Sequence, residues 1–304
     1  QAMGAPNSMR RGLTAAWCML CVDALASPAL MGRWGTSSKC EVVSVRSEAN
    51  AKLRIAIVPG NPGLPQYYTR FAEDLSQKLD VPVDVIGLCG HSVKPAGPEW
   101  ALYSLQDQIA HVEDYVRSCG QQSQTVFIGH SIGTYICMEV MRRQPNAVSQ
   151  VLGVMPYLEN NEASEKFRKT IDAARLPAVF FWPLLAFLCT VLGIAQCLPR
   201  SARKMLIGSR VEAFDEESAR FTEETMLQPR IFANYAFMGR TELANHSRRY
   251  SFQEHIGTEL CSRVKVLYTV DDFWAPETFL QRASEDGVEA FCTPGLPHAF
   301  CTPG

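Results

Sequence analysis

Residues 125–141 read Thr-Val-Phe-Ile-Gly129-His-Ser131-Ile-Gly133-Thr-Tyr-Ile-Cys-Met-Glu-Val-Met. The first residues form an apolar run that is typical of a buried strand, and the last ones have apolar residues at helical spacing. Between them stands Gly-His-Ser-Ile-Gly. A Gly-x-Ser-x-Gly motif in a strand–turn–helix context is the signature of a nucleophile elbow.

The two glycines of this motif have a steric reason. A sharp strand-to-helix turn brings the residues two before and two after Ser131 close to its backbone, where a larger side chain would collide. Ser131 Oγ would then stand above the sheet, and the N–H of Ile132 would lie beside the reacting carbonyl. A chance match of such a short motif is the alternative, but the flanking strand and helix argue against it.

Strand and helix patterns alternate on both sides of the elbow. Strands are predicted at 41–47, 53–58, 83–88, 125–130, 149–155, 263–270 and 287–291, and helices at 67–79, 105–116 and 276–284. Such alternation favours an α/β fold with a mostly parallel, doubly wound sheet. We expect 41–156 and 263–304 to form the two parts of this core.

The alternation lapses over residues 157–262, which we expect to form an inserted helical lid. Within it, 178–198 is a run of 21 residues without a charge. Its length would allow it to span a bilayer. Pro183 and Gly193 interrupt it, so we favour two short helices that dip into one leaflet or into a lipid monolayer. A buried interface between lid and core is the other interpretation.

Chain order selects a candidate histidine. An α/β-hydrolase carries its triad in the order serine, acid, histidine. Of the six histidines, His298 alone follows an acid at the end of a strand, and it lies in the loop after the last predicted strand. The acid is Asp271 or Asp272, since only one of two adjacent side chains can point at the imidazole. A surface histidine without a catalytic role is the alternative.

The turn Pro59-Gly60-Asn61-Pro62-Gly63 follows the 53–58 strand, where this fold places its second oxyanion donor. Pro62 has no N–H. The N–H of Asn61 is therefore the candidate donor, with the N–H of Ile132 as its partner. A second Gly-His-Ser, at 90–92, has Lys94 where an elbow needs glycine, and we assign it no catalytic role.

The composition narrows the range of functions. The 304 residues carry a formal net charge of −2 and show no basic stripe, so we expect no nucleic-acid partner. The 11 cysteines do not form a secreted disulfide pattern, and Cys18-x-x-Cys21 has no second pair at zinc spacing. We therefore expect no metal and no cofactor. Residues 1–40, with Asp23 as their single acid, are expected to be a disordered or targeting leader.

Several motifs together carry a resemblance to a known family. They are 57–63 followed by Tyr67-Tyr68, the elbow at 128–133, Asp272 with Trp274 and Pro276, and Leu296-Pro-His-Ala-Phe300. From about residue 53 to 300 the chain resembles the lipid droplet-associated hydrolase family of the α/β-hydrolase superfamily. The resemblance implies Ser131 as nucleophile, Asp272 as acid and His298 as base. It also implies a location at lipid droplets and the endoplasmic reticulum, and action on sterol or other lipid esters.

Two functions of different class are compatible with these patterns. One is a serine esterase that cleaves a lipid ester through an acyl-enzyme at a droplet or membrane surface contacted by 178–198. The other is a droplet-surface protein that organises lipid with little turnover. The sequence identifies neither the ester nor a protein partner.

Overall fold

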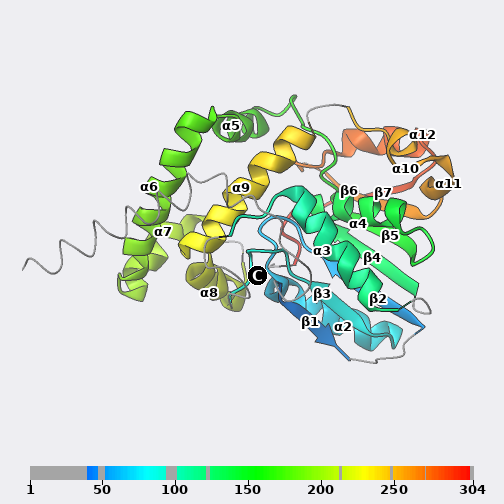
Figure 1. Ribbon diagram of the computed structural model, residues 1–304, viewed down its shortest axis with the longest axis horizontal. Helices are drawn as coiled ribbons and strands as arrows, with labels where there is room; N and C mark the ends of the chain where they lie inside the picture. Colours follow the sequence, from blue (N-terminus) through cyan, green and yellow to red (C-terminus); the bar gives the residue numbers. More distant parts are fainter. Residues whose placement is uncertain are drawn as a thin grey trace, which may run out of the picture.

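The computed structural model describes residues 40–46, 52–93, 101–120, 124–211, 214–246, 249–270 and 272–301. The predicted leader at 1–40 lies outside this part of the chain except for Cys40, and so does Asp271. One seven-stranded sheet forms the centre of the molecule (Figure 1). Its strands are β1 (Val42–Val45), β2 (Leu53–Val58), β3 (Val83–Ile86), β4 (Gln124–His130), β5 (Val148–Val154), β6 (Val264–Thr269) and β7 (Glu289–Thr293).

The strand order is β1-β3-β2-β4-β5-β6-β7. β1 pairs with β3 in antiparallel orientation, and each of the other neighbours is parallel. The edge position and short length of β1 match its alternating sequence. This sheet, with helices on both faces, confirms the predicted α/β-hydrolase fold.

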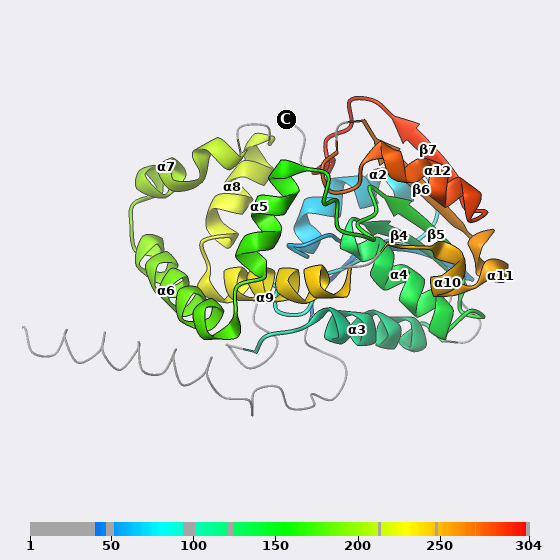
Figure 2. The same ribbon diagram turned by 90° about the horizontal axis from the view of Figure 1, so that it is seen from above.

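Both faces of the sheet are buried, which explains why the central strands are apolar runs. In β2, Ala56 and Val58 join the core on one face, whereas Ile55 and Ile57 join the core on the other. The first face is covered by α3 (Leu105–Ser118) and α4 (Ile132–Arg143), and the second by α2 (Thr69–Leu79) after the short 3₁₀ turn η2 (Pro65–Tyr68) (Figure 2).

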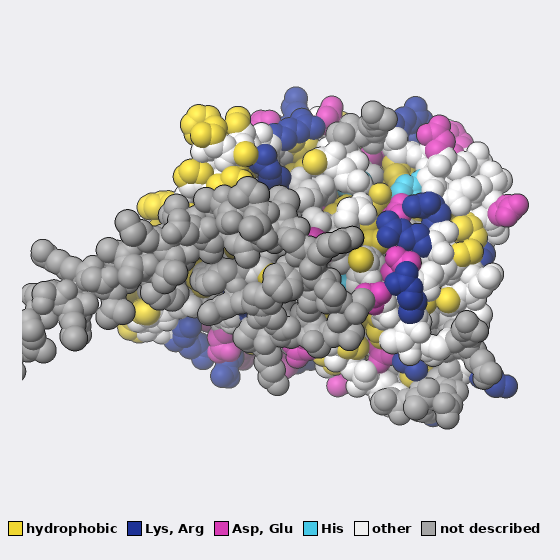
Figure 3. Space-filling view, in the orientation of Figure 1, with side chains coloured by type: hydrophobic (Ala, Val, Ile, Leu, Met, Phe, Trp, Pro, Cys, Tyr) yellow, Lys and Arg dark blue, Asp and Glu magenta, His cyan; other side chains and the backbone are white. Residues whose placement is uncertain are grey.

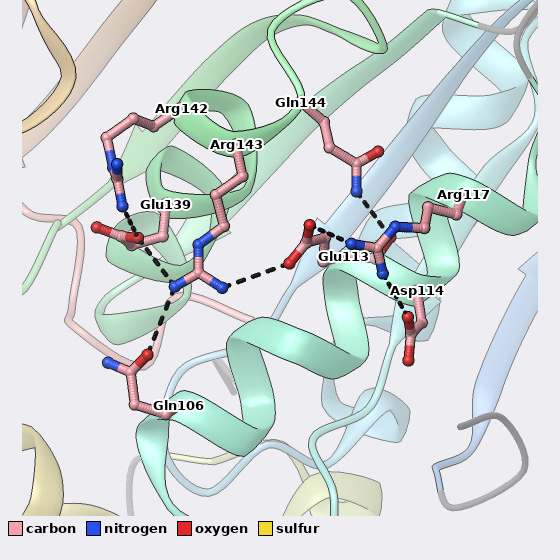
Figure 4. Close-up of polar contacts among 8 residues, drawn as sticks. All are labelled: Gln106, Glu113, Asp114, Arg117, Glu139, Arg142, Arg143 and Gln144. Atoms are coloured by element: carbon pink, nitrogen blue, oxygen red, sulfur yellow. Dashed lines mark hydrogen bonds and ion pairs between the residues drawn. The ribbon is translucent and has the colours of Figure 1, made fainter. Parts of the chain in front are cut away.

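Charged side chains join α3 to α4 at their solvent side (Figure 4). Arg143 contacts Glu139 on its own helix and Glu113 on α3. Glu113 also pairs with Arg117 on α3. The exposed pairs contribute little to stability. Glu139 is different, because its carboxylate is buried and also contacts Arg142 and His255. It therefore links the elbow helix to a later part of the chain.

In the described part of the chain, seven helices lie between β5 and β6, and the first five of them form an insertion beside the sheet (Figures 1 and 2). They are α5 (Glu165–Ala174), α6 (Ala178–Gln196), α7 (Arg200–Val211), α8 (Glu216–Thr225) and α9 (Pro229–Asn245). The predicted lid also included 252–261, which form α10 (Phe252–Ile256) and α11 (Thr258–Cys261). Phe252, Ile256 and Cys261 pack in the core with β6, so these two helices belong with the sheet. The 3₁₀ turn η3 (Glu277–Phe279) and α12 (Leu280–Glu285) precede β7.

The prediction of two short helices within 178–198 is wrong. Residues 178–196 form the single helix α6, with Pro183 inside it. Pro183 lies in the second turn, so one hydrogen bond near the start of the helix is lost while the later turns stay paired. Among the described helices, α6 is the one long and apolar enough to cross a membrane by length and composition, and 22% of its most apolar window is buried. Phe181, Leu185 and Cys189 pack with Ala233 of α9, so one side of α6 faces protein.

The ion pairs of Glu139 predict a pH-dependent contribution to stability. Burial alone would raise the pKa of Glu139, but hydrogen bonds and charge from His255 and Arg142 lower it from 4.5 to about 2. A carboxyl group whose pKa is lowered by folding stabilises the fold at pH values above its unfolded-state pKa. This stabilisation is lost as the pH falls through the folded-state pKa. Glu139→Gln should lower the free energy of unfolding by about 1–3 kcal/mol near neutral pH. The difference from the parent should disappear as pH falls from about 4.5 to about 2.

Denaturant titrations at several pH values measure this contribution. Glu224→Gln is the matched control, because the Arg220–Glu224 pair is exposed and should change stability by less than about 1 kcal/mol. A Glu139→Gln variant whose deficit is the same at all pH values would contradict the account.

Candidate active site

The chain turns sharply between β4 and α4 at Ser131. Its φ of 53° and ψ of −123° lie outside the regions that ordinary residues prefer. The Ser131 N–H donates to the carbonyl of Val154 on β5 over 3.0 Å, and the Ser131 carbonyl accepts from the Thr134 N–H over 3.1 Å. These bonds hold a strained backbone at the carboxyl edge of the sheet, and such strain is often stored at functional sites.

The two glycines of the motif are required by close backbone contacts. A Cβ on Gly129 would lie 2.5 Å from the Cα of Thr134. A Cβ on Gly133 would lie 2.2 Å from the carbonyl oxygen of Val58. Atoms do not approach so closely, so both positions exclude a side chain. The predicted steric reason for these glycines therefore matches the contacts of the turn.

Asp272 and His298 are joined by a hydrogen bond. His298 Nδ1 lies 2.6 Å from Asp272 Oδ2, and Asp272 Oδ1 accepts from the Trp274 N–H over 2.8 Å. Asp272 follows β6 and His298 follows β7, so both lie at the same edge of the sheet as Ser131. Burial by itself raises the pKa of Asp272, but the bond and charge of His298, together with backbone N–H groups, hold the pKa below its usual value. The carboxylate thus stays ionised against the imidazole.

The His298 loop packs against the elbow. The rings of His130 and His298 have centroids 5.0 Å apart, and Phe300 packs edge-on against His130 at 5.1 Å. The structure therefore places the bonded pair of Asp272 and His298 against His130, the residue that precedes Ser131.

The 59–63 turn lies against the elbow. A Cβ on Gly60 would be 3.1 Å from Ser131 Cβ and 3.2 Å from His130 Nδ1. The Gly60 N–H donates to Tyr68 Oη over 3.2 Å, and the Gly63 N–H donates to His91 Nδ1 over 2.7 Å. Within the described part of the chain, the N–H groups of Asn61 and Ile132 have no hydrogen-bond partner. These two donors are the ones selected from the sequence.

Two side chains that fix this turn were not identified from the sequence. Tyr68 Oη accepts from Gly60 and lies 2.5 Å from His130 Nδ1, and His91 accepts from Gly63. Burial lowers the pKa of His130 to about 3 and that of His91 to about 4, so both rings are neutral at ordinary pH. A neutral ring nitrogen can accept a hydrogen bond. The position of His91 just after a strand was the one signal that could have pointed to it.

A buried acid on α9 lies beside the same turn. The Asn61 side chain donates from Nδ2 to the carbonyl of Tyr235, and its amide also neighbours Glu242. Burial raises the pKa of Glu242 to about 8, although the contact with Asn61 opposes this. The carboxyl is therefore mostly protonated at neutral pH. The sequence around Glu242 resembles that of an ordinary helix, so nothing in the sequence indicated that this acid lies beside the 59–63 turn.

This arrangement has the parts needed for nucleophilic acyl transfer. It has a serine at a strained turn, a carboxylate-bound imidazole, and a turn with a backbone donor packed beside the serine. In the described residues, the single group of His, Cys and acidic side chains with metal spacing is Cys40, Cys89 and His111, which includes none of these residues.

Comparison with known proteins places the chain among relatives of one family and agrees with the fold. A family model described as lipid-droplet associated hydrolase matches residues 51–301. The lipid droplet-associated hydrolase of Homo sapiens is 26% identical over 277 residues, which cover 84% of this chain and 82% of that protein. The protein of the same name from Drosophila melanogaster is 27% identical over 267 residues, covering 81% of this chain and 83% of that protein.

Solved structures with the same fold share a lower sequence identity with this chain. A thermophilic esterase from Thermogutta terrifontis superimposes with a TM-score of 0.55 at 12% identity, covering 87% of this chain and 89% of that one. A meta-cleavage product hydrolase gives a TM-score of 0.58 at 14% identity, covering 86% and 88%. At this identity the likeness concerns the fold alone.

The contact at Gly133 predicts a large effect of a single methyl group. Gly133→Ala should lower the free energy of unfolding by about 1–3 kcal/mol or more, because α4 must move away from the Val58 carbonyl. Gly193→Ala in α6 is the matched control, since the nearest atom to its Cβ would be Pro229 Cγ at 3.6 Å. Alanine should stabilise that helix by about 0.5–1 kcal/mol. Equal stability of the two variants in denaturant titrations would show that the crossing at Gly133 is not tight.

Proposed function

The chain belongs to the lipid-droplet associated hydrolase family, and on this premise we propose that it is a serine hydrolase that cleaves a carboxylic ester of a lipid. The observation that carries the proposal is the 2.6 Å bond between Asp272 and His298, beside a serine held in a strained turn. The family supports hydrolase activity, and the solved structures support the fold on which the proposal depends.

In the proposed mechanism, Ser131 Oγ attacks the ester carbonyl. His298 takes the proton at Nε2, because Nδ1 is bonded to Asp272. Asp272 orients the ring and stabilises the imidazolium that forms. The N–H groups of Asn61 and Ile132 donate to the oxyanion. His298 then protonates the leaving alcohol, and water attacks the acyl-enzyme on Ser131 to release the acid.

A lipid surface is the proposed partner of α6. The helix has no charged residue, and its side away from α9 exposes Phe180, Phe187 and Ile194 at 63%, 64% and 64%. Figure 3 shows hydrophobic side chains along the part of the surface formed by α6. Each such side chain gains about 1.5–3 kcal/mol when it is fully buried in an apolar phase. We therefore propose that α6 lies in the lipid monolayer of a droplet without crossing a bilayer.

The names of the relatives support a droplet location. The endoplasmic reticulum, which the sequence resemblance also implied, stays a prediction. The apolar face of α6 would hold the protein on lipid without any chemistry at Ser131, and this favours a second candidate function. In that case the protein would organise the droplet surface and turn over little ester.

Labelling with a fluorophosphonate probe distinguishes the two functions, because such probes react with activated serines. The parent should give one adduct, located on Ser131 by mass spectrometry. Ser131→Ala should abolish labelling, and loss of the triad should cost about 10³–10⁶-fold in kcat toward an ester. Labelling of the Ala variant at the parent's rate would exclude Ser131 as the nucleophile.

The turn that supplies Asn61 gives a separate prediction. His91→Leu removes the acceptor of the Gly63 N–H and leaves a buried donor unpaired. The labelling rate at Ser131 should fall about 10–100-fold as the turn loosens, whereas probe affinity changes less. His91→Asn, whose side-chain oxygen can accept near the position of Nδ1, should restore part of the rate. If the Leu variant reacts as fast as the parent, His91 does not position the turn.

Acidic substitutions on α6 test the lipid surface. The double variant Phe180→Asp and Phe187→Asp should leave droplets for the cytosolic fraction while its unfolding transition stays near that of the parent. The control is Leu79→Asp with Phe291→Asp, which changes two apolar residues exposed at 56% and 48% on α2 and β7. This control should remain on droplets. Full droplet retention of the α6 variant would place the anchor elsewhere.

A further inference from the structure

Two cysteines and a histidine meet near the edge strand β1, and none of them takes part in the proposed chemistry of Ser131. Cys40 precedes β1, Cys89 lies in the loop after β3, and His111 lies on α3. Their Sγ, Sγ and ring-nitrogen atoms all lie within 4.8 Å of one another. We propose that Cys40, Cys89 and His111 form a binding site for Zn²⁺ or a metal ion of similar softness.

The His111 ring has the environment of a metal ligand. Its Nε2 is buried and has no hydrogen-bond partner. The backbone at Gly87 forms a hydrogen bond with the ring. Zinc-bound histidines commonly donate one ring N–H to a backbone carbonyl and bind the metal with the other nitrogen.

The second ligand, Cys89, is held in place from the same helix. The buried side chain of Gln108 accepts from the Cys89 N–H over 2.7 Å and donates to the Cys89 carbonyl over 3.0 Å. Gln108 and His111 are three positions apart on α3, so they share a face of the helix. The relative positions of Cys89 and His111 are therefore set by one rigid element, which favours a preorganised site.

Cys40 approaches from the edge strand. The Gly87 N–H donates to the Glu41 carbonyl over 2.9 Å, which ties the start of β1 to the loop that leads to Cys89. Cys40 packs in the small apolar cluster of Cys89, Ala101 and Tyr103. In a tetrahedral zinc site the ligand atoms are about 3.5–3.8 Å apart. Because the three ligand atoms already lie within 4.8 Å of one another, each pair would approach by about 1 Å or less around the ion.

The charges also fit a divalent ion. Two thiolates and a neutral imidazole balance Zn²⁺ to a net charge of zero, which lowers the cost of placing it in partly buried surroundings. Sulfur and imidazole ligands select zinc over Mg²⁺ or Ca²⁺, which prefer oxygen. A water molecule would supply the fourth ligand. The site could not be predicted from the sequence, because its ligands come from three separate elements without the spacing of a zinc motif.

Cobalt binding tests the site without reference to activity. The full chain, reduced and without a histidine tag, should bind one equivalent of Co²⁺ and develop a thiolate-to-cobalt charge-transfer band that Zn²⁺ removes. Cys40→Ala and His111→Gln should each weaken binding about 10–100-fold or more. Cys292→Ser is the matched control, since this exposed cysteine lies outside the group, and it should bind as the parent does.

Thermal unfolding gives a second readout for variants that fold poorly. A metal that binds the folded state raises the Tm, so Zn²⁺ should raise, and a chelator should lower, the Tm of the parent and of Cys292→Ser but not of His111→Gln. The proposal fails if the parent binds no stoichiometric metal, or if Cys40→Ala and His111→Gln bind the metal as tightly as the parent. It also fails if Cys40 and Cys89 are joined as a disulfide in protein purified under reducing conditions.

Discussion

The close crossing of β2 and α4 is the constraint on which the rest of the site depends. At Gly133 the helix backbone meets the carbonyl oxygens of Val58 and Pro59 with no space for a Cβ. This contact fixes the start of α4 over the end of β2. It therefore sets both the strained backbone of Ser131 and the position of the 59–63 turn beside it. The loop after β7 packs against the turn at Ser131 through the contacts of His298 and Phe300 with His130.

The helical insertion connects the turn at Ser131 to the exposed apolar side of α6. One side of α6 packs on α9, and its other side is exposed. The α9 carbonyl of Tyr235 accepts a hydrogen bond from the Asn61 side chain, and Glu242 of α9 lies beside the same amide. The proposed lipid-facing helix and the proposed oxyanion turn therefore contact a single helix.

The sequence was sufficient for the features that have a fixed local pattern. The elbow combines a motif with its strand and helix, the glycines have a steric cause, and chain order selects His298. Choosing Asp272 over Asp271 needed the family resemblance. The contacts of Tyr68, His91 and Glu242 with the 59–63 turn could not be predicted, because they are tertiary contacts that no local pattern specifies. The continuity of α6 was not predicted, because one proline near the start of a long apolar helix removes a single backbone hydrogen bond, and this loss does not divide the helix.

The central claim is that Asp272 and His298 act on Ser131 as one unit. The rate of fluorophosphonate reaction at Ser131 in Asp272→Asn, His298→Ala and the double variant measures this directly. If the claim holds, each single change slows the reaction by about 10³-fold or more, and the double variant is no slower than His298→Ala. Single changes whose effects multiply in the double variant, or a parent-like rate in Asp272→Asn, would contradict it.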